Sequence, residues 1–246
     1  MQETTWDIKA PDGAMIYGIK SGLKDGAKVA VFMVHGLTRD INDYVIKYGA
    51  DFFAQDYDVY RFNLYGGQEG ARDILECTLS DHADDINAVL AHFAGSYDRA
   101  FVIGHSYGGP SVMLANPESI TAVSLWDPTF DLKMWQDEYK SAFHEKDDYF
   151  VVGVGVYTLI GKPLYASARK LDDAACTKLA KDFAQPVQVV LGGESVLANM
   201  PHSYHSFNRY KKSHQVVIPN AGHCFTEGKT ADVLLEKTRA WFDTFK

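Results

Sequence analysis

Residues 101–115 have the sequence FVIGHSYGGPSVMLA, in which a serine lies at the junction of an apolar run and a glycine-rich segment. Ser106 follows a short apolar run typical of a buried strand and precedes a segment with helical character. Gly104 and Gly108 flank it in the pattern G-x-S-x-G, in which a sharp turn from strand to helix exposes a serine as a nucleophile. The glycines are needed because side chains there would collide with the neighbouring strand and helix. A chance match in a structural turn is the alternative; the strand before Ser106 and the helix after it favour a nucleophile.

The rest of the chain alternates between strands and helices. A hairpin is predicted over residues 4–20, around Pro11-Asp12-Gly13. Helices are predicted over residues 41–56, 81–93 (capped by Ser80), 109–116, 171–183 and 230–245. Further strands are predicted to begin at Lys28, Asp58, Arg99, Ile120, Val187 and His214. This order predicts an α/β fold, with a mostly parallel central sheet and helices on both of its faces.

Residues 129–185 break the alternation. We interpret them as a small cap, inserted after the sixth strand and rising over the carboxyl end of the sheet. No internal repeat or low-complexity linker divides the chain, so a single domain over residues 1–246 is predicted.

Composition and charge narrow the partners. With 46% hydrophobic and 23% charged residues, the chain has the composition of a globular protein. Its net charge of −8 disfavours nucleic acid and anionic membranes, which are polyanions. No apolar run is long enough to span a bilayer, and the first residues lack the features of a signal peptide. Cys77, Cys176 and Cys224 suit neither a disulfide framework nor a metal site, so a cytoplasmic location is expected.

A serine hydroxyl needs a positioned base, and His223 is the best candidate among nine histidines. It lies on the loop between the last strand and the closing helix. His105 is next to Ser106 in the turn and cannot easily face its hydroxyl. His35 also ends a strand, but its context indicates a different role.

With these pieces the chain resembles the α/β-hydrolase superfamily over nearly its whole length. The resemblance rests on "VHGLT" at 34–38, "GHSYGG" at 104–109, "NPESITAVSLWDP" at 116–128 and "NAGHCF" at 220–225. It implies that Ser106 attacks an acyl carbon and that His223 takes up the proton and later returns it. It also implies an oxyanion hole made by the backbone N–H groups of Leu37 and Tyr107, on a loop shaped by His35-Gly36. Neither a metal nor a cofactor is implied.

The family pattern fails at the acid of the triad. Many members place an aspartate three residues after a glycine that ends the seventh strand, and here that position holds Ser195. Glu194 lies one position early. Asp127, at the end of the sixth strand, is favoured, since lipases of the pancreatic type place their acid similarly. Alternatively, Asp127 has only a structural role, as a turn residue before Pro128.

The cap is rich in large apolar side chains. They favour an apolar acyl or alkyl group, or they form the core of the cap itself. The residues are Met134, Trp135, Tyr139, Phe143, Tyr149, Phe150, Tyr157 and Leu159.

The leading hypothesis is therefore a serine esterase that acts on small apolar carboxylic esters. A thioesterase, a C–C hydrolase or an acyltransferase would use the same residues. Because Ser195 occupies the usual acid position, a non-catalytic receptor for a small ligand is the alternative outside enzymes. The sequence makes no prediction of an oligomeric state.

Overall fold

The computed structural model describes residues 2–23, 26–154, 156–199 and 213–245. Its main sheet has eight strands in the order β1-β2-β4-β3-β5-β6-β10-β11. The first two strands are antiparallel to each other, β2 is antiparallel to β4, and all other neighbours are parallel. The predicted, mostly parallel α/β sheet is confirmed. The strands are β1 (Gln2–Lys9), β2 (Met15–Gly22), β3 (Val29–Val34), β4 (Asp58–Phe62), β5 (Arg99–His105), β6 (Ala122–Trp126), β10 (Val187–Gly192) and β11 (Ser213–Ile218).

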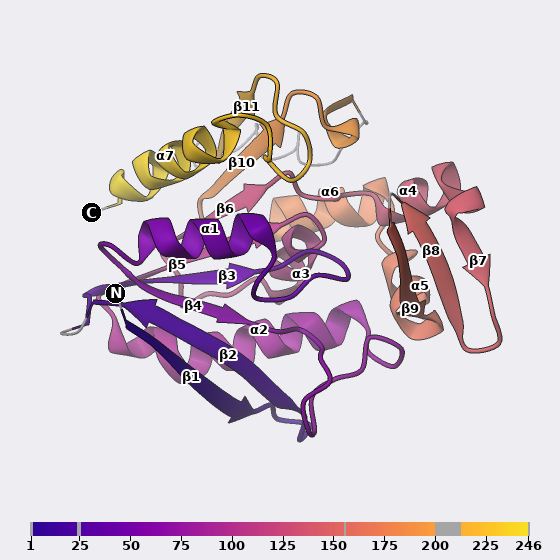
Figure 1. Cartoon of the computed structure of the whole chain (residues 1–246), viewed down its shortest axis with the longest axis horizontal. Coiled ribbons are helices and arrows are strands. Elements are labelled where there is room, and N and C mark those ends of the chain that lie inside the picture. Colours follow the sequence, from indigo (N-terminus) through magenta and orange to yellow (C-terminus); the bar gives the residue numbers. More distant parts are fainter. Residues whose placement is uncertain (1, 24–25, 155, 200–212, 246) are drawn as a thin grey trace.

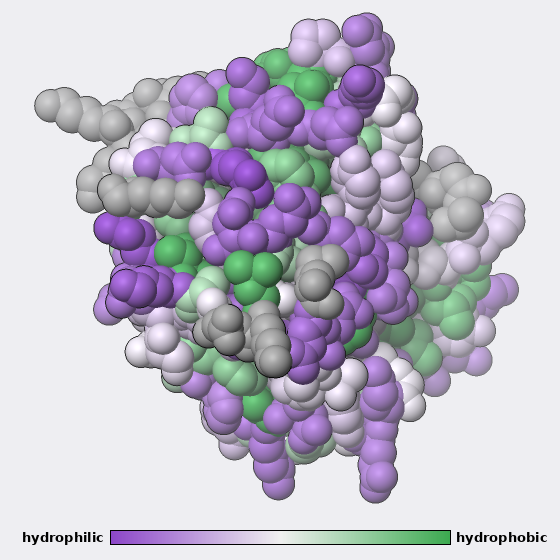
Figure 2. All heavy atoms as spheres, turned by 60° about the vertical axis from the view of Figure 1, so that its left-hand side comes forward, coloured by the Kyte–Doolittle hydropathy of each residue, from purple (hydrophilic) through white to green (hydrophobic). Residues whose placement is uncertain are grey.

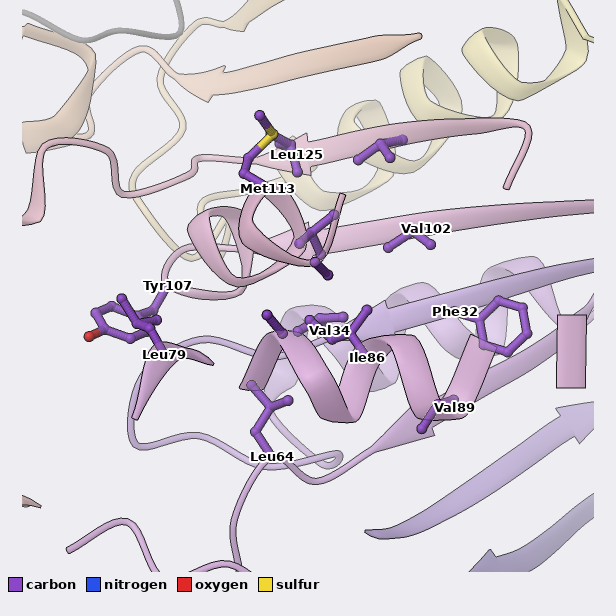
Figure 3. Close-up of a cluster of buried hydrophobic side chains, with 14 of the residues drawn as sticks. Phe32, Val34, Leu64, Leu79, Ile86, Val89, Val102, Tyr107, Met113 and Leu125 are labelled. Carbon is purple, nitrogen blue, oxygen red and sulfur yellow. The ribbon is translucent and has the colours of Figure 1, made fainter. Parts of the chain in front are cut away.

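Two hydrophobic cores lie on the two faces of this sheet, because alternate residues of a strand point to opposite sides. Val31 and Met33 of β3 pack with α1 (Tyr44–Phe53) and α7 (Thr230–Asp243). Phe32 and Val34 belong to the other core, with α2 (Leu79–Phe93) and α3 (Gly108–Ala115). Figure 3 shows this second core, and Figure 1 shows α1 and α7 on one side of the sheet. The near-continuous apolar strands in the sequence are thus buried on both faces, as parallel sheets require.

The start of α2 differs from the prediction. Its N-cap is Thr78, not Ser80. The Thr78 hydroxyl accepts a hydrogen bond from the Asp81 N–H, and the Asp81 carboxylate accepts one from the Thr78 N–H. This reciprocal capping box satisfies two backbone donors at the helix start, so the helix begins two residues earlier than predicted.

The segment between β6 and β10 holds a second, three-stranded antiparallel sheet, which the sequence analysis did not predict. It consists of β7 (Phe143–Glu145), β8 (Tyr149–Val154) and β9 (Val156–Gly161). The helices α4 (Leu132–Glu138), α5 (Lys162–Ala168) and α6 (Asp173–Asp182) belong to the same segment. Short 3₁₀ turns lie at Ala94–Ser96, Lys140–Ala142 and Val196–Asn199. In Figure 1 the small sheet lies beyond the end towards which β3 points.

Some of the large apolar side chains of the cap are buried against one another, and others are exposed to solvent. Phe150, Val152 and Ile160 form a small core of their own, against which Phe143 and Tyr165 pack. Tyr157 and Leu159 are exposed. The large apolar residues of the cap therefore have several roles.

The end of the molecule opposite the cap is turned forward in Figure 2. Polar side chains cover most of this face, and hydrophobic ones form small separate areas between them, as is normal for protein surfaces. Within the ranges that the structure describes, no helix combines the length and the apolar character needed to cross a bilayer.

Candidate active site

The turn that carries Ser106 follows β5 directly. Ser106 has a φ of 54°, a left-handed conformation that is uncommon for a residue with a side chain. The turn is also crowded: a Cβ atom on Gly108 would lie 2.6 Å from the Val34 carbonyl oxygen, and one on Gly104 would lie 2.9 Å from the Gly108 carbonyl oxygen. Only glycine allows β3, β5 and α3 to approach this closely. The predicted strand–serine–helix turn is thus present, with its strain located at the serine.

The imidazole of His223 lies against the Ser106 hydroxyl. His223 follows β11, and its Nε2 is 2.8 Å from the Ser106 Oγ. On the other side of the ring, Nδ1 is 2.6 Å from the Asp127 Oδ2. An ionised carboxylate can only accept, so Nδ1 carries the hydrogen and Nε2 is left to accept from the serine hydroxyl. The three side chains form one directed chain of hydrogen bonds.

Asp127 supplies the carboxylate that accepts the hydrogen bond from His223. It follows β6 directly, with a φ of 40°, and its side chain is fully buried. Its Oδ1 accepts a hydrogen bond from the Gly192 N–H at 3.0 Å. Glu194, the other candidate acid, is exposed at the surface. Asp127 and not Glu194 therefore contacts His223.

Ser195, in the position that many relatives give to the acid, contacts that acid directly. Its hydroxyl donates to the Asp127 Oδ2 over 2.5 Å and accepts from the Leu197 N–H at 3.2 Å. Ser195 is buried. The Asp127 Oδ2 thus accepts hydrogen bonds from both the His223 Nδ1 and the Ser195 hydroxyl. Sequence reasoning identified the position but not this contact.

The peptide between Gly36 and Leu37 has a fixed orientation. The Gly36 carbonyl oxygen accepts from the His35 Nδ1 at 2.8 Å, the Tyr65 hydroxyl at 3.2 Å and the Arg39 N–H at 3.3 Å. In a trans peptide the N–H points away from the carbonyl, so these donors turn the Leu37 N–H in the opposite direction. Tyr65 was not identified from the sequence as part of this loop.

Leu37 and Tyr107 both line the cavity beside Ser106. Neither N–H donates a hydrogen bond to any residue that the structure describes. The Tyr107 ring belongs to the core shown in Figure 3. Both groups are therefore free to donate to a ligand.

Two other histidines near the site are buried. Burial lowers the pKa of His35 to about 4 and that of His105 to about 3, so both rings are neutral at pH 7. The His35 Nε2 accepts from the Leu64 N–H. The His105 Nε2 donates to the His223 carbonyl at 3.0 Å, so His105 supports the backbone of His223 and does not face the serine.

A cavity of about 330 Å³ opens beside Ser106 and His223. Apolar side chains form much of its wall, including Trp135 and Tyr139 from the cap and Leu197 from the main domain. Cys224 also lines it, and burial raises the pKa of this thiol. Across the described ranges, no group of three or more His, Cys, Asp or Glu side chains is placed to bind a metal ion.

Comparison with known proteins identifies the family of the chain. Residues 31–235 match the sequence model of the alpha/beta hydrolase family, and the chain belongs to that family. No curated protein matches the chain.

Several solved structures share the fold at low sequence identity. Est1E from Butyrivibrio proteoclasticus, solved with ferulic acid bound, has a TM-score of 0.78 at 18% identity and 98% coverage of both chains. The alpha/beta hydrolase GrgF from Penicillium sp. sh18 has a TM-score of 0.79 at 12% identity, with 100% of this chain and 99% of the other covered. A thermophilic esterase from Thermogutta terrifontis, with malate bound, has a TM-score of 0.71 at 16% identity, with coverage of 98% and 99%.

Proposed function

We propose that this chain is a serine hydrolase that cleaves carboxylic esters. The Ser106 Oγ attacks the acyl carbon while the His223 Nε2 takes its proton, and Asp127 stabilises the imidazolium that forms. The oxygen of the tetrahedral intermediate accepts from the N–H groups of Leu37 and Tyr107. His223 then gives the proton to the leaving alcohol, and a water molecule activated by the same imidazole hydrolyses the acyl-enzyme.

One observation carries this proposal. The His223 imidazole lies 2.8 Å from the Ser106 hydroxyl and 2.6 Å from the buried Asp127 carboxylate. The three groups are next to a cavity that Leu37 and Tyr107, with their free amides, also line. The alternative of a non-catalytic receptor rested on the serine at 195. Asp127 supplies a carboxylate at His223 despite that serine, which supports an enzyme over a receptor.

The cavity supports small esters with an apolar acyl or alkyl group. Its apolar wall would bury such a group against Trp135 and Tyr139. The similar structure from Thermogutta terrifontis is described as an esterase, which supports this class. We also propose a cytoplasmic location, because Cys77, Cys176 and Cys224 are all free thiols.

The test compares wild type with Ser106→Ala and, as a matched control, Glu194→Gln. A fluorophosphonate probe should label the wild type and Glu194→Gln, and both should hydrolyse 4-nitrophenyl butyrate. Ser106→Ala should not be labelled and should lose about a thousandfold or more of the turnover, since no nucleophile remains. Equal hydrolysis by Ser106→Ala and wild type would refute the proposal.

A further inference from the structure

Arg39 brings a positive charge to the cavity. It is the only Arg, Lys, Asp or Glu among the described residues that line it, and its side chain is 47% exposed. The Arg39 N–H closes a turn onto the Gly36 carbonyl at 3.3 Å. Gly36 in turn lies against the serine, because a Cβ atom added there would be 3.0 Å from the Ser106 Cβ. The side chain of Arg39 therefore starts one short turn away from the reacting hydroxyl.

The guanidinium of Arg39 is only loosely paired. Its contact with a carboxylate is Nε to the Asp43 Oδ1 at 3.6 Å, which is longer than a hydrogen bond. Asp43 is itself partly buried, and its other oxygen lies 4.0 Å from the His105 Nδ1. Within the part of the chain that the structure describes, the two Nη groups make no hydrogen bond. The planar end of the guanidinium, which binds carboxylates with two parallel hydrogen bonds, is therefore available.

The charge of Arg39 acts on the same wall of the cavity as His223. Burial raises the pKa of the Cys224 thiol, and the Arg39 charge opposes that rise. Cys224 is the neighbour of His223 and lines the cavity with it. Arg39, Ser106 and His223 line one cavity, so a substrate held there can contact the guanidinium and the reacting groups together.

A cation beside an apolar cavity favours a ligand that carries both an apolar group and an anion. An apolar group that fills the cavity removes water from the guanidinium, and this is costly unless the ligand supplies an anion in return. Building on the proposed esterase function, we infer that the preferred substrates are esters that carry a carboxylate. Arg39 binds that carboxylate, and the apolar part of the ester lies against Trp135 and Tyr139.

The experiment uses matched ester pairs that differ in one carboxylate. Monomethyl glutarate and methyl pentanoate place the carboxylate, or its neutral counterpart, on the acyl side. 4-Acetoxybenzoate and its methyl ester do so on the alcohol side. In each pair, kcat/KM is measured for wild type and for Arg39→Gln. We expect the variant to lose about tenfold more on the carboxylate member of one pair than on its neutral partner, as for loss of a charged hydrogen bond at a half-exposed site. The pair that responds identifies the side of the ester that Arg39 binds.

Two further variants separate binding from structure. Arg39→Lys keeps the charge but not the planar fork, so it should retain part of the preference. Asp43→Asn removes the competing carboxylate and should strengthen the preference for the anionic ester. An equal loss on both members of both pairs, or a weaker preference in Asp43→Asn, would overturn the inference. If wild type hydrolyses neutral esters through Ser106 but Arg39→Gln shows no selective loss, only this inference fails. If wild type hydrolyses neither these four esters nor 4-nitrophenyl butyrate, the proposed function fails.

Discussion

The hydroxyl of Ser195 gives the sharpest test of how the candidate site is held together. It donates to the Asp127 Oδ2, which also receives His223, and both Ser195 and Asp127 are buried. Ser195→Ala deletes this donor and also the oxygen that accepts from the Leu197 N–H. We expect the variant to be less stable and slower, because the carboxylate is no longer held on that side.

The size of the effect follows from the charge on the acceptor. A hydrogen bond to an ionised group contributes about 1.5–3 kcal/mol to stability, and one between neutral groups about 0.5–1.5 kcal/mol. Ser195→Ala should therefore cost about 2 kcal/mol in the wild type but about 1 kcal/mol when Asp127 is replaced by Asn. The difference, about 1 kcal/mol, is the coupling energy of a double-mutant cycle. Turnover should fall about tenfold in Ser195→Ala, but by much less when the change is made in Asp127→Asn.

The assay is urea unfolding, together with initial rates on 4-nitrophenyl butyrate, for wild type, both single variants and the double variant. Ser195→Thr keeps the hydroxyl and serves as the matched control, so it should retain more activity than Ser195→Ala. Additive effects in both measurements would contradict a coupling between Ser195 and Asp127. Ser195 would then stabilise the loop without acting through Asp127.

Two other changes test the fold that holds the site. Gly108→Ala should cost more than 3 kcal/mol of unfolding free energy or prevent folding, because its Cβ would meet the backbone oxygens of Val34 and His35. The control Gly95→Ala lies at an exposed position with open space around its Cβ, so it should be nearly neutral in urea unfolding. Burial lowers the pKa of His82 to about 3 from about 6.5, so between these values only the unfolded chain binds the proton and stability falls as the pH drops. In urea unfolding at pH 7 and pH 5, His82→Phe should remove about 2 kcal/mol of that fall, and an unchanged difference between the two pH values would contradict the cause.

The parts of the molecule that could be predicted from sequence are those with local signals. The glycines around Ser106 mark a crowded turn, and the apolar runs before and after it specify a strand and a helix. His223 could be chosen among nine histidines because its loop follows a predicted strand and precedes a helix. These signals are short-range, so neighbouring residues suffice to interpret them.

Other features depend on contacts that the local sequence does not contain. The start of α2 was predicted at Ser80, because serine is a good N-cap, but the side chains of Thr78 and Asp81 cap each other two residues earlier. The small sheet of the cap has glycine within its strands, which weakens the strand signal. At Gly153 the ring of Tyr157 from the next strand covers the space that a side chain would fill, and this contact becomes visible only when the strands are paired.

The candidate acid, Asp127, was favoured from the sequence, but the contact between Asp127 and Ser195 was not. Because β6 and β10 are parallel neighbours, with Trp126 opposite Val190, both strands end at the same edge of the sheet. Asp127 follows one of these ends, and its N–H donates to the Val190 carbonyl, while Ser195 follows the other end. Their side chains meet at one carboxylate oxygen, 2.6 Å from the His223 ring. The imidazole requires a carboxylate at that place and does not require it from a particular strand. The spacing along β10 alone leads to Ser195, whereas the place of Asp127 at the end of the sixth strand made it the favoured acid in the sequence analysis. The pairing of the two strands explains how that carboxylate reaches the imidazole.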